Sequence, residues 1–304
     1  MSQAQAYLNG RFIPASAAAI PVYDAGFVQG VTVSEQLRTF GGRLFRLDAH
    51  LDRLWESLQS VGIHPPISRT ELTSVADGLV ASNHALLDPG DDLGLAILIT
   101  PGPYAGLSGG VSAAPTVCLH TYPLAFSLWA QKYDRGEALC VTEVQQTPAE
   151  CWPRRLKCRS RMHYYLADRQ ARAIDPSARA LLMDAHGNVT ETANANILVL
   201  LPEEGWCSPP LDQILPGITL AATCDLARSL GQSICERILT RDDVLDAEEV
   251  LLASTPNCIL PVMRFHGSPI GSGAPGPAYL MLLEAWNRLV GIDISAQARE
   301  FSHR

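Results

Sequence analysis

Apolar residues recur with two different periods in the first part of the chain. Tyr7-Leu-Asn-Gly-Arg-Phe-Ile13 predicts a β-hairpin that turns at Asn9-Gly10. Residues 31–40 alternate loosely as a strand does, and Gly41-Gly42 leads into a second predicted strand over 43–47. Two apolar runs, 95–100 and 116–121, predict buried strands.

A helix is predicted between these strands. Its apolar residues recur at helical spacing, at Leu47, Leu51, Leu54, Leu58 and Val61. We expect Asp48 to cap its start and Gly62 to end it.

The second part of the chain repeats this mixture of elements. Strands are predicted over 139–144, 180–184, 196–201 and 249–253, and helices over 160–174, 219–230 and 276–290. The stretch 122–134 has no clear period. We therefore expect an α+β protein with a small N-terminal domain over 1–122, a linker over 123–134 and a large C-terminal domain over 135–304.

Composition narrows the class of protein. The chain has 304 residues, 47% of them hydrophobic and 18% charged, which is typical of a globular protein. A net charge of −8 argues against nucleic acid as a partner. We find no signal peptide and no membrane span. The eight cysteines form no Cys-x-x-Cys pair and no zinc-type cluster, so we expect a cytoplasmic protein with free, mostly buried thiols and no metal site.

Lysine is rare in this chain. Only Lys132 and Lys157 accompany twenty-one arginines. Arginine replaces lysine as a surface cation but not as a nucleophilic amine, because its guanidinium stays protonated. Lys157 stands among apolar and basic residues, which both lower an amine's pKa, whereas the segment around Lys132 has the composition of a solvated connector. Lys157 is therefore the candidate for Schiff-base chemistry, although a compositional bias toward Ala and Arg also explains the low lysine count.

Three groups suit an anionic ligand, although each also has an ordinary structural interpretation. Arg53 lies with His50 and Ser57 on one stripe of the predicted helix, where it can grip a phosphate or simply face solvent. Leu215-Pro-Gly-Ile-Thr219 opens a helix whose free N–H groups can bind an anion or form a plain cap. Ser254-Thr255 follows a strand, and its two hydroxyls can supply a third set of donors to the same anion.

A carboxylate is predicted in apolar surroundings. Glu191 follows the turn Asp184-Ala-His-Gly-Asn188 and lies between small and apolar residues. Burying it without a partner is costly. A pyridinium nitrogen or an arginine would stabilise it, and the residues alone favour neither.

Together these residues resemble the fold-type IV pyridoxal-phosphate enzymes, the class IV aminotransferases. This family includes branched-chain and D-amino-acid aminotransferases, (R)-selective amine transaminases and aminodeoxychorismate lyases. The resemblance covers nearly the whole chain, and its markers include Asp24-Ala-Gly-Phe-Val-Gln-Gly30, Glu35-Gln-Leu-Arg38, 45–54, Leu156-Lys157, 184–191 with Asn196, 215–219 and Ser254-Thr255.

The resemblance implies roles for these residues. Lys157 would hold pyridoxal 5'-phosphate as a Schiff base and move the substrate proton, and Glu191 would keep the pyridine nitrogen protonated. The implied cofactor-binding residues are Arg53, Lys157, Glu191, Asn196, Ile218, Thr219, Ser254 and Thr255. The family also implies a cofactor lying between two domains, a homodimer, and an amino donor and a 2-oxo acid as substrates.

The positions that set specificity depart from the known subfamilies. Ser34 replaces a common aromatic residue, and no Arg-x-His carboxylate trap follows Thr100. Arg38 and Tyr104 are candidates for the substrate pocket, and Arg155, Arg159 and Arg161 are further arginines that could meet a substrate carboxylate. The ordinary explanation is stronger for these arginines: they are charges on a helix surface, with Arg38 as a structural partner of Glu35. The predicted reaction is transamination in amino-acid metabolism. The alternatives are a lyase that releases pyruvate and a cofactor-binding protein without turnover.

Overall fold

The computed structural model describes residues 3–111 and 114–303 and divides the chain into two compact units. Unit 1 contains the chain up to Leu124 together with Leu156–Ser160, and unit 2 contains Ala125–Arg155 and the chain from Arg161 onward. Part of the expected linker, residues 126–128 and 132–134, is helical and belongs to unit 2. The domain boundaries expected from the sequence stay a prediction.

Unit 1 is built on a six-stranded sheet in the order β2-β1-β6-β5-β3-β4. Its strands are β1 (Gln5–Leu8), β2 (Arg11–Pro14), β3 (Val33–Phe40), β4 (Arg43–Leu44), β5 (Leu93–Thr100) and β6 (Thr116–Pro123). Its helices are η1 (Ala15–Ala17), α1 (Ala25–Val28), α2 (Leu47–Ser60) and α3 (Arg69–His84).

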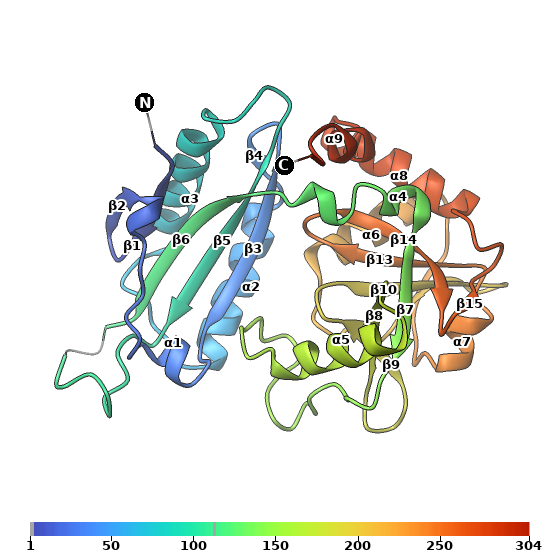
Figure 1. Cartoon of the computed structure of the whole chain (residues 1–304), viewed down its shortest axis with the longest axis horizontal. Coiled ribbons are helices and arrows are strands. Elements are labelled where there is room, and N and C mark those ends of the chain that lie inside the picture. Colours follow the sequence, from blue (N-terminus) through green and yellow to red (C-terminus); the bar gives the residue numbers. More distant parts are fainter. Residues whose placement is uncertain (1–2, 112–113, 304) are drawn as a thin grey trace. The chain divides into compact units, whose positions relative to one another are not determined.

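Helices α2 and α3 cover one face of this sheet (Figure 1). Alternate residues of β3, β5 and β6 point toward these helices and form the unit's hydrophobic core, as Val33, Leu37, Leu95, Ile97 and Leu119 do. Residues at the intervening positions, Ser34, Gln36 and Arg38 of β3 among them, therefore lie on the opposite face.

The N-terminal hairpin and the start of α2 test the local predictions. Asn9 and Gly10 both have positive φ, as the predicted Asn-Gly turn requires. The expected cap was wrong: Arg46, in a left-handed conformation, is the N-cap of α2, and Asp48 lies in the first turn. An acidic residue there still stabilises the helix through its dipole.

Unit 2 contains a nine-stranded sheet. Its strands are β7 (Glu137–Val141), β8 (Ala178–Met183), β9 (Val189–Thr192), β10 (Asn196–Leu201), β11 (Gly205–Ser208), β12 (Ile234–Glu236), β13 (Glu249–Ser254), β14 (Cys258–Phe265) and β15 (Ser268–Pro269). Its helices are η2 (Phe126–Leu128), α4 (Lys132–Arg135), α5 (Met162–Ile174), α6 (Ile218–Ser229), α7 (Arg241–Leu245), α8 (Pro277–Val290) and α9 (Ile294–Glu300).

Six strands of this sheet close into a ring. The order runs β10-β13-β14-β7-β8-β9, and β9 pairs back onto β10 through Glu191 and Asn196. Closure leaves no free edge among these strands and encloses a core of Leu139, Ile197, Val199, Leu252 and Phe265. Glu191 and Asn196 thus lie where the ring closes.

The cysteines correct one expectation. Cys207 of β11 and Cys235 of β12 form a disulfide, so the eight thiols are not all free. Four of the other six cysteines are buried. No described helix is long and apolar enough to cross a membrane.

Candidate active site

Lys157 is held at the edge of β3 in unit 1. The Ser34 amide donates to the Lys157 carbonyl at 2.9 Å, and the Arg159 amide donates to the Thr32 carbonyl at 2.9 Å. Ser57 of α2 accepts a bond from the Lys157 amide at 3.2 Å. The segment 157–159 therefore extends the sheet by a short antiparallel pairing, with Val33 opposite Cys158.

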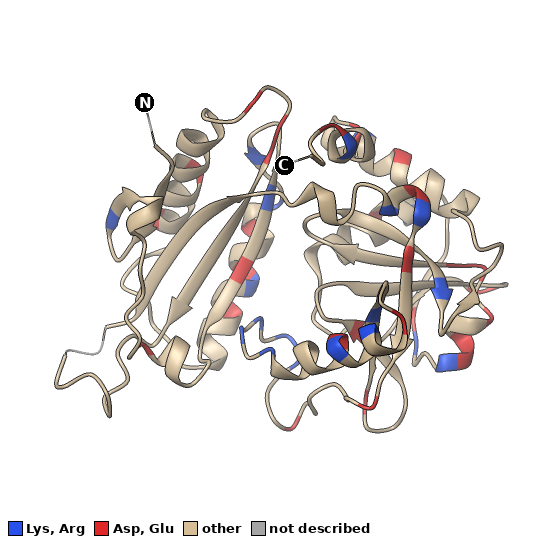
Figure 2. Ribbon diagram, in the orientation of Figure 1, with Lys and Arg blue, Asp and Glu red and all other residues tan. Residues whose placement is uncertain are grey.

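This register determines which side chains share a face. Because Val33 and Cys158 are partners, Lys157 lies beside Ser34 and Arg159 beside Thr32, on the face opposite α2 and α3. Leu156 packs into the core on the other face. Basic residues gather along this stretch of chain, which leads into α5 (Figure 2).

Lys132, the other lysine, is already engaged. Its Nζ donates to both carboxylate oxygens of Glu137 at 3.0 Å, and the Glu137 side chain is almost fully buried. The Lys132 amine is thus held in an ion pair with a buried carboxylate.

Arg53 is paired within unit 1. Its Nε and Nη2 donate to the two oxygens of Glu35 at 2.8 and 2.9 Å, and both side chains are buried. His50 Nδ1 lies 2.8 Å from Glu35 Oε2. Burial raises the pKa of Glu35, but Arg53 and His50 outweigh it and hold that pKa at about 2.

Two structural interpretations are therefore wrong. Arg53 is not a solvated residue at a helix edge, since it is 6% exposed. Arg38 is not a partner of Glu35, because the two lie on opposite faces of β3 and the Glu35 carboxylate is bonded by Arg53 and His50. Arg38 is buried, donates to the Thr39 carbonyl at 3.2 Å and stacks over Phe40.

Glu191 lies in a network of neutral donors in unit 2. Its Oε1 accepts bonds from Gln146 Nε2 at 3.0 Å and the Tyr164 hydroxyl at 2.9 Å. Its Oε2 accepts bonds from Asn196 Nδ2 at 3.2 Å and the Leu215 amide at 3.3 Å. Burial raises the pKa of Glu191 to about 7, and the charges of Arg154 and Arg161 only partly oppose it.

The turn before β9 sets the position of Glu191. Asp184 accepts bonds from the amides of His186 and Asn188, both at 2.8 Å, and Gly187 has a φ of +82°. Any other residue at Gly187 would be strained. The turn thus directs β9 back along β8 and toward β10.

Asn196 links Glu191 to the start of α6. Its Nδ2 also donates to the Leu215 carbonyl at 2.9 Å, and a Cβ on Gly217 would come within 2.0 Å of its Oδ1. Ile218 and buried Thr219 begin the helix directly after Gly217. Asn196 also pairs with Ala253, which precedes Ser254 on β13. Unit 2 therefore brings together the predicted residues Glu191, Asn196, Ile218, Thr219, Ser254 and Thr255.

The predicted residues in unit 1 are more dispersed. Ser34 pairs with Leu98 near the end of β5 and Arg38 with Gly94 near its start. The four-residue separation spans about 13 Å. Tyr104 lies in the loop after β5, bonded through its amide to the Tyr23 carbonyl and 37% exposed.

Gln146 and Tyr164 were missed by the sequence prediction. They lie 45 and 27 residues before Glu191, and Gln146 belongs to an irregular loop. No local signal marks such long-range partners.

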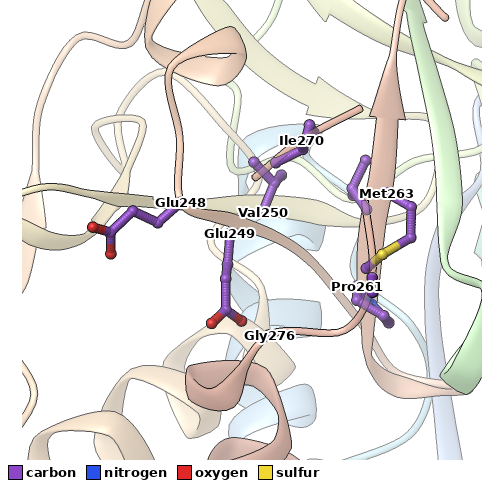
Figure 3. A pocket seen from close by; sticks show the side chains of 9 residues that line it. Glu248, Glu249, Val250, Pro261, Met263, Ile270 and Gly276 are labelled. Atoms are coloured by element: carbon purple, nitrogen blue, oxygen red, sulfur yellow. The ribbon is translucent and has the colours of Figure 1, made fainter. Parts of the chain in front are cut away.

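A small recess lies between β13 and the start of α8, and one of its carboxylates serves as a helix cap. Glu249 points toward Gly276 while Glu248 points away (Figure 3), and the Glu249 oxygens accept the amides of Ala278 and Tyr279 at 2.9 and 2.8 Å. A carboxylate at a helix start satisfies unpaired N–H groups.

Comparison with known proteins identifies the family. The model of the family "Amino-transferase class IV" matches residues 32–265. The chain belongs to the class IV aminotransferases. It is 31% identical to D-alanine aminotransferase of Bacillus licheniformis over 272 residues, which are 88% of this chain and 91% of that protein.

Solved structures confirm the fold-type IV architecture. The branched-chain amino acid aminotransferase of Escherichia coli superposes with a TM-score of 0.82 at 23% identity, covering 95% of both chains. A second branched-chain enzyme, solved with pyridoxamine 5'-phosphate, has a TM-score of 0.84 at 24% identity, covering 96% of this chain and 95% of that one.

The predicted reaction is confirmed at the level of the class. This aminotransferase is a pyridoxal-phosphate-dependent transaminase that acts on amino-acid and 2-oxo-acid substrates. The relatives are named as aminotransferases, and they favour neither the lyase nor the protein without turnover.

Proposed function

We propose that Lys157 is the residue that binds pyridoxal phosphate and transfers the substrate proton, and that Glu191 partners the pyridine nitrogen. The observation that carries the first assignment is the engagement of Lys132 by Glu137. Since a guanidinium cannot act as the amine, Lys157 is the lysine left for this chemistry.

The surroundings of Glu191 fit a pyridinium. The carboxylate is buried, and its hydrogen bonds in the described structure all come from neutral donors. A cation at hydrogen-bond distance would favour its ionised form and lower its pKa. Protonated pyridoxal phosphate supplies such a cation and withdraws electrons from the reacting carbon.

The phosphate is assigned to two sets of residues. The amides of Ile218 and Thr219 begin α6 without a side-chain cap, and Ser254 and Thr255 follow β13. We further propose that Arg53, oriented by Glu35 and His50, contributes to the binding of the phosphate dianion. Arg53→Ala should then weaken cofactor retention.

The oligomeric state and the cellular compartment also belong to this proposal. We propose a homodimer, as is usual in the family. The cytoplasmic location inferred from the sequence stays a prediction, and the disulfide counts against it because disulfides are rare in reducing compartments.

The decisive experiment is chemical labelling. Borohydride reduction of the cofactor-loaded protein should place the cofactor on the peptide that carries Lys157. Lys157→Ala should lower the rate of transamination by about 100-fold or more, because the proton shuttle is removed. Label on Lys132, or a fully active Lys157→Ala variant, would overturn the assignment.

The donor is best identified by the half-reaction. With donor alone, conversion of the bound cofactor to its pyridoxamine form reports transamination without an acceptor. We expect amino-acid donors to react, with a profile that differs from that of a D-alanine enzyme because Ser34 is small. D-Alanine, L-leucine, L-glutamate and (R)-phenylethylamine form the panel, tested before and after Ser34→Tyr. A D-alanine preference unaffected by Ser34→Tyr would contradict a role for Ser34.

A further inference from the structure

Tyr122 of β6 reaches across β5 toward β3. Arg38, Gly94 and Tyr122 form one cross-strand row, since Arg38 pairs with Gly94 and Gly94 with Tyr122. A Cβ on Gly94 would lie 2.2 to 2.6 Å from the outer ring atoms and hydroxyl of Tyr122. The ring therefore occupies the space above Gly94. Glycine is needed at this position because any Cβ would collide with the Tyr122 ring, and not because the backbone has an unusual φ.

The Tyr122 hydroxyl is held in a basic, polar setting. The Gln36 side chain is hydrogen-bonded to it and lowers its pKa, as a donor to the phenol oxygen does. Because Gln36 is the donor in this bond, the Tyr122 hydroxyl can still donate its own proton to another acceptor. Burial raises the pKa of Tyr122, and the guanidinium groups of Arg159 and Arg38 oppose that rise because they lie nearby.

The same face carries Lys157 and an unsatisfied hydroxyl. The register of 157–159 on β3 places Lys157 beside Ser34 and Arg159 one step further on that face. Ser34 Oγ is buried and has no hydrogen-bond partner among the described residues. A buried orphan hydroxyl is costly unless a ligand or water satisfies it.

The charge on this face is one-sided. Even-numbered residues of β3, β5 and β6 point away from α2 and α3. These residues lie within 34–40, 94–100 and 116–122, and none of them is acidic. The side chains that these strands contribute to the face beside Lys157 are thus cationic or neutral. This pattern suits an anion with a planar pair of oxygens, which arginine binds by two parallel hydrogen bonds.

We propose that Arg159, Tyr122 and Gln36 form the subsite that binds the carboxylate of the amino donor beside Lys157. Arg159 supplies the charge, Tyr122 donates its hydroxyl proton, and Gln36 orients Tyr122. The inference rests on the proposed role of Lys157 and adds the group of the donor that this sheet face recognises. Amino acids are then the substrates, and amines without a carboxylate are poor ones.

Binding of an unreactive carboxylate tests this subsite apart from turnover. The cofactor-loaded protein is titrated with propanoate and with propanamide, its uncharged analogue, and binding is followed through the absorbance of the bound cofactor. Propanoate should bind at least about tenfold more tightly than propanamide. Arg159→Gln should weaken propanoate binding by about 10- to 100-fold, as expected for loss of a charged hydrogen bond, and leave propanamide binding unchanged.

Two further variants address Tyr122. Tyr122→Phe removes the hydroxyl, and Gly94→Ala keeps it but displaces the ring; both should weaken propanoate binding by about 3- to 30-fold. Arg11→Gln, an exposed position on β2, and Gly78→Ala, which has open space on α3, are the matched controls and should bind as the wild type does.

The outcomes separate the two proposals. Wild-type propanoate binding in both Arg159→Gln and Tyr122→Phe overturns the subsite even if the enzyme transaminates. Loss of binding in these variants supports the subsite even if labelling excludes Lys157. A wild type that binds propanoate and propanamide equally also overturns it.

Discussion

At the scale of single residues, Glu191 makes stability depend on pH. Its pKa is raised by burial from 4.5 to about 7, so the folded protein holds a proton that the unfolded chain has lost between these values. The contribution of Glu191 to the stability of the cofactor-free protein should therefore fall as pH rises from about 4.5 to about 7, by roughly 3 kcal/mol in total. Urea unfolding of wild type and Glu191→Gln across this range measures this contribution as the difference between the two proteins.

The variant Glu191→Gln removes the ionisable group from the same network and should abolish this contribution. The nearby His163, whose pKa is lowered to about 4 mainly by burial, contributes with the opposite sign because the unfolded chain binds its proton at higher pH, and this contribution is common to both proteins. Burial also raises the pKa of Tyr164, so the phenol keeps its proton. Equal slopes in wild type and Glu191→Gln would show that Glu191 is ionised throughout. With cofactor bound, Glu191→Gln should retain the cofactor but slow transamination, since an amide cannot hold the ring nitrogen protonated.

At the scale of elements, helix α2 forms one buried and one exposed ion pair. Arg53 contacts Glu35 of β3 at 2.8 Å with both side chains buried, and Asp52 contacts Arg69 of α3 at 2.8 Å with both exposed. Glu35→Gln leaves the buried guanidinium without its charge partner and should lower the free energy of unfolding by about 3–5 kcal/mol. Asp52→Asn is the control, and it should cost less than about 1 kcal/mol.

Denaturant unfolding of the cofactor-free protein measures both variants without interference from the phosphate. Similar losses in the two variants would mean that the Glu35–Arg53 pair does not hold β3 against α2. The comparison also separates structural from ligand-binding effects, because Arg53 is proposed to act in both.

The elements that were predicted are those with a clear local period. Helix α2 shows a regular apolar stripe, and the Asn9-Gly10 hairpin has its own turn chemistry. Helix α3 was missed although Ser68 and Glu71 form a capping box, because its buried face includes Ala76 and Asn83 and its hydrophobic pattern is weak. Strands β11 and β12 are only four and three residues long, too short to show a period.

Residue type and local surroundings singled out Lys157 and Glu191 as candidates. Their roles came from the resemblance to the class IV aminotransferases and stay predictions. Gln146, Tyr164 and the pairing of Arg53 with Glu35 depend on contacts across 18 to 45 residues, which the fold alone brings together. The carboxylate subsite likewise depends on the register between β3, β5 and β6.

At the scale of the whole molecule, the disulfide gives a countable prediction. Cys207 and Cys235 are direct partners on parallel strands, with Cα atoms 4.8 Å apart, within the usual range for disulfides. The unfolded, unreduced protein should show six reactive thiols, and eight after reduction. Because the bridge closes a loop of 28 residues at one end of the unit 2 sheet, reduction should lower stability by about 3–4 kcal/mol.

Cys207→Ala is the matched variant and should make stability insensitive to reductant, whereas Cys140→Ala removes a buried cysteine outside the bridge and should leave that sensitivity intact. Eight thiols in protein purified without reductant would contradict the disulfide and remove the argument against a reducing compartment. Six thiols, with the bridge mapped to these two residues, would mean that the sheet end of unit 2 is covalently fixed in the isolated protein. The same count in protein alkylated at the moment of cell lysis would place the oxidation inside the cell and count against the cytoplasmic prediction, because disulfides are rare in reducing compartments.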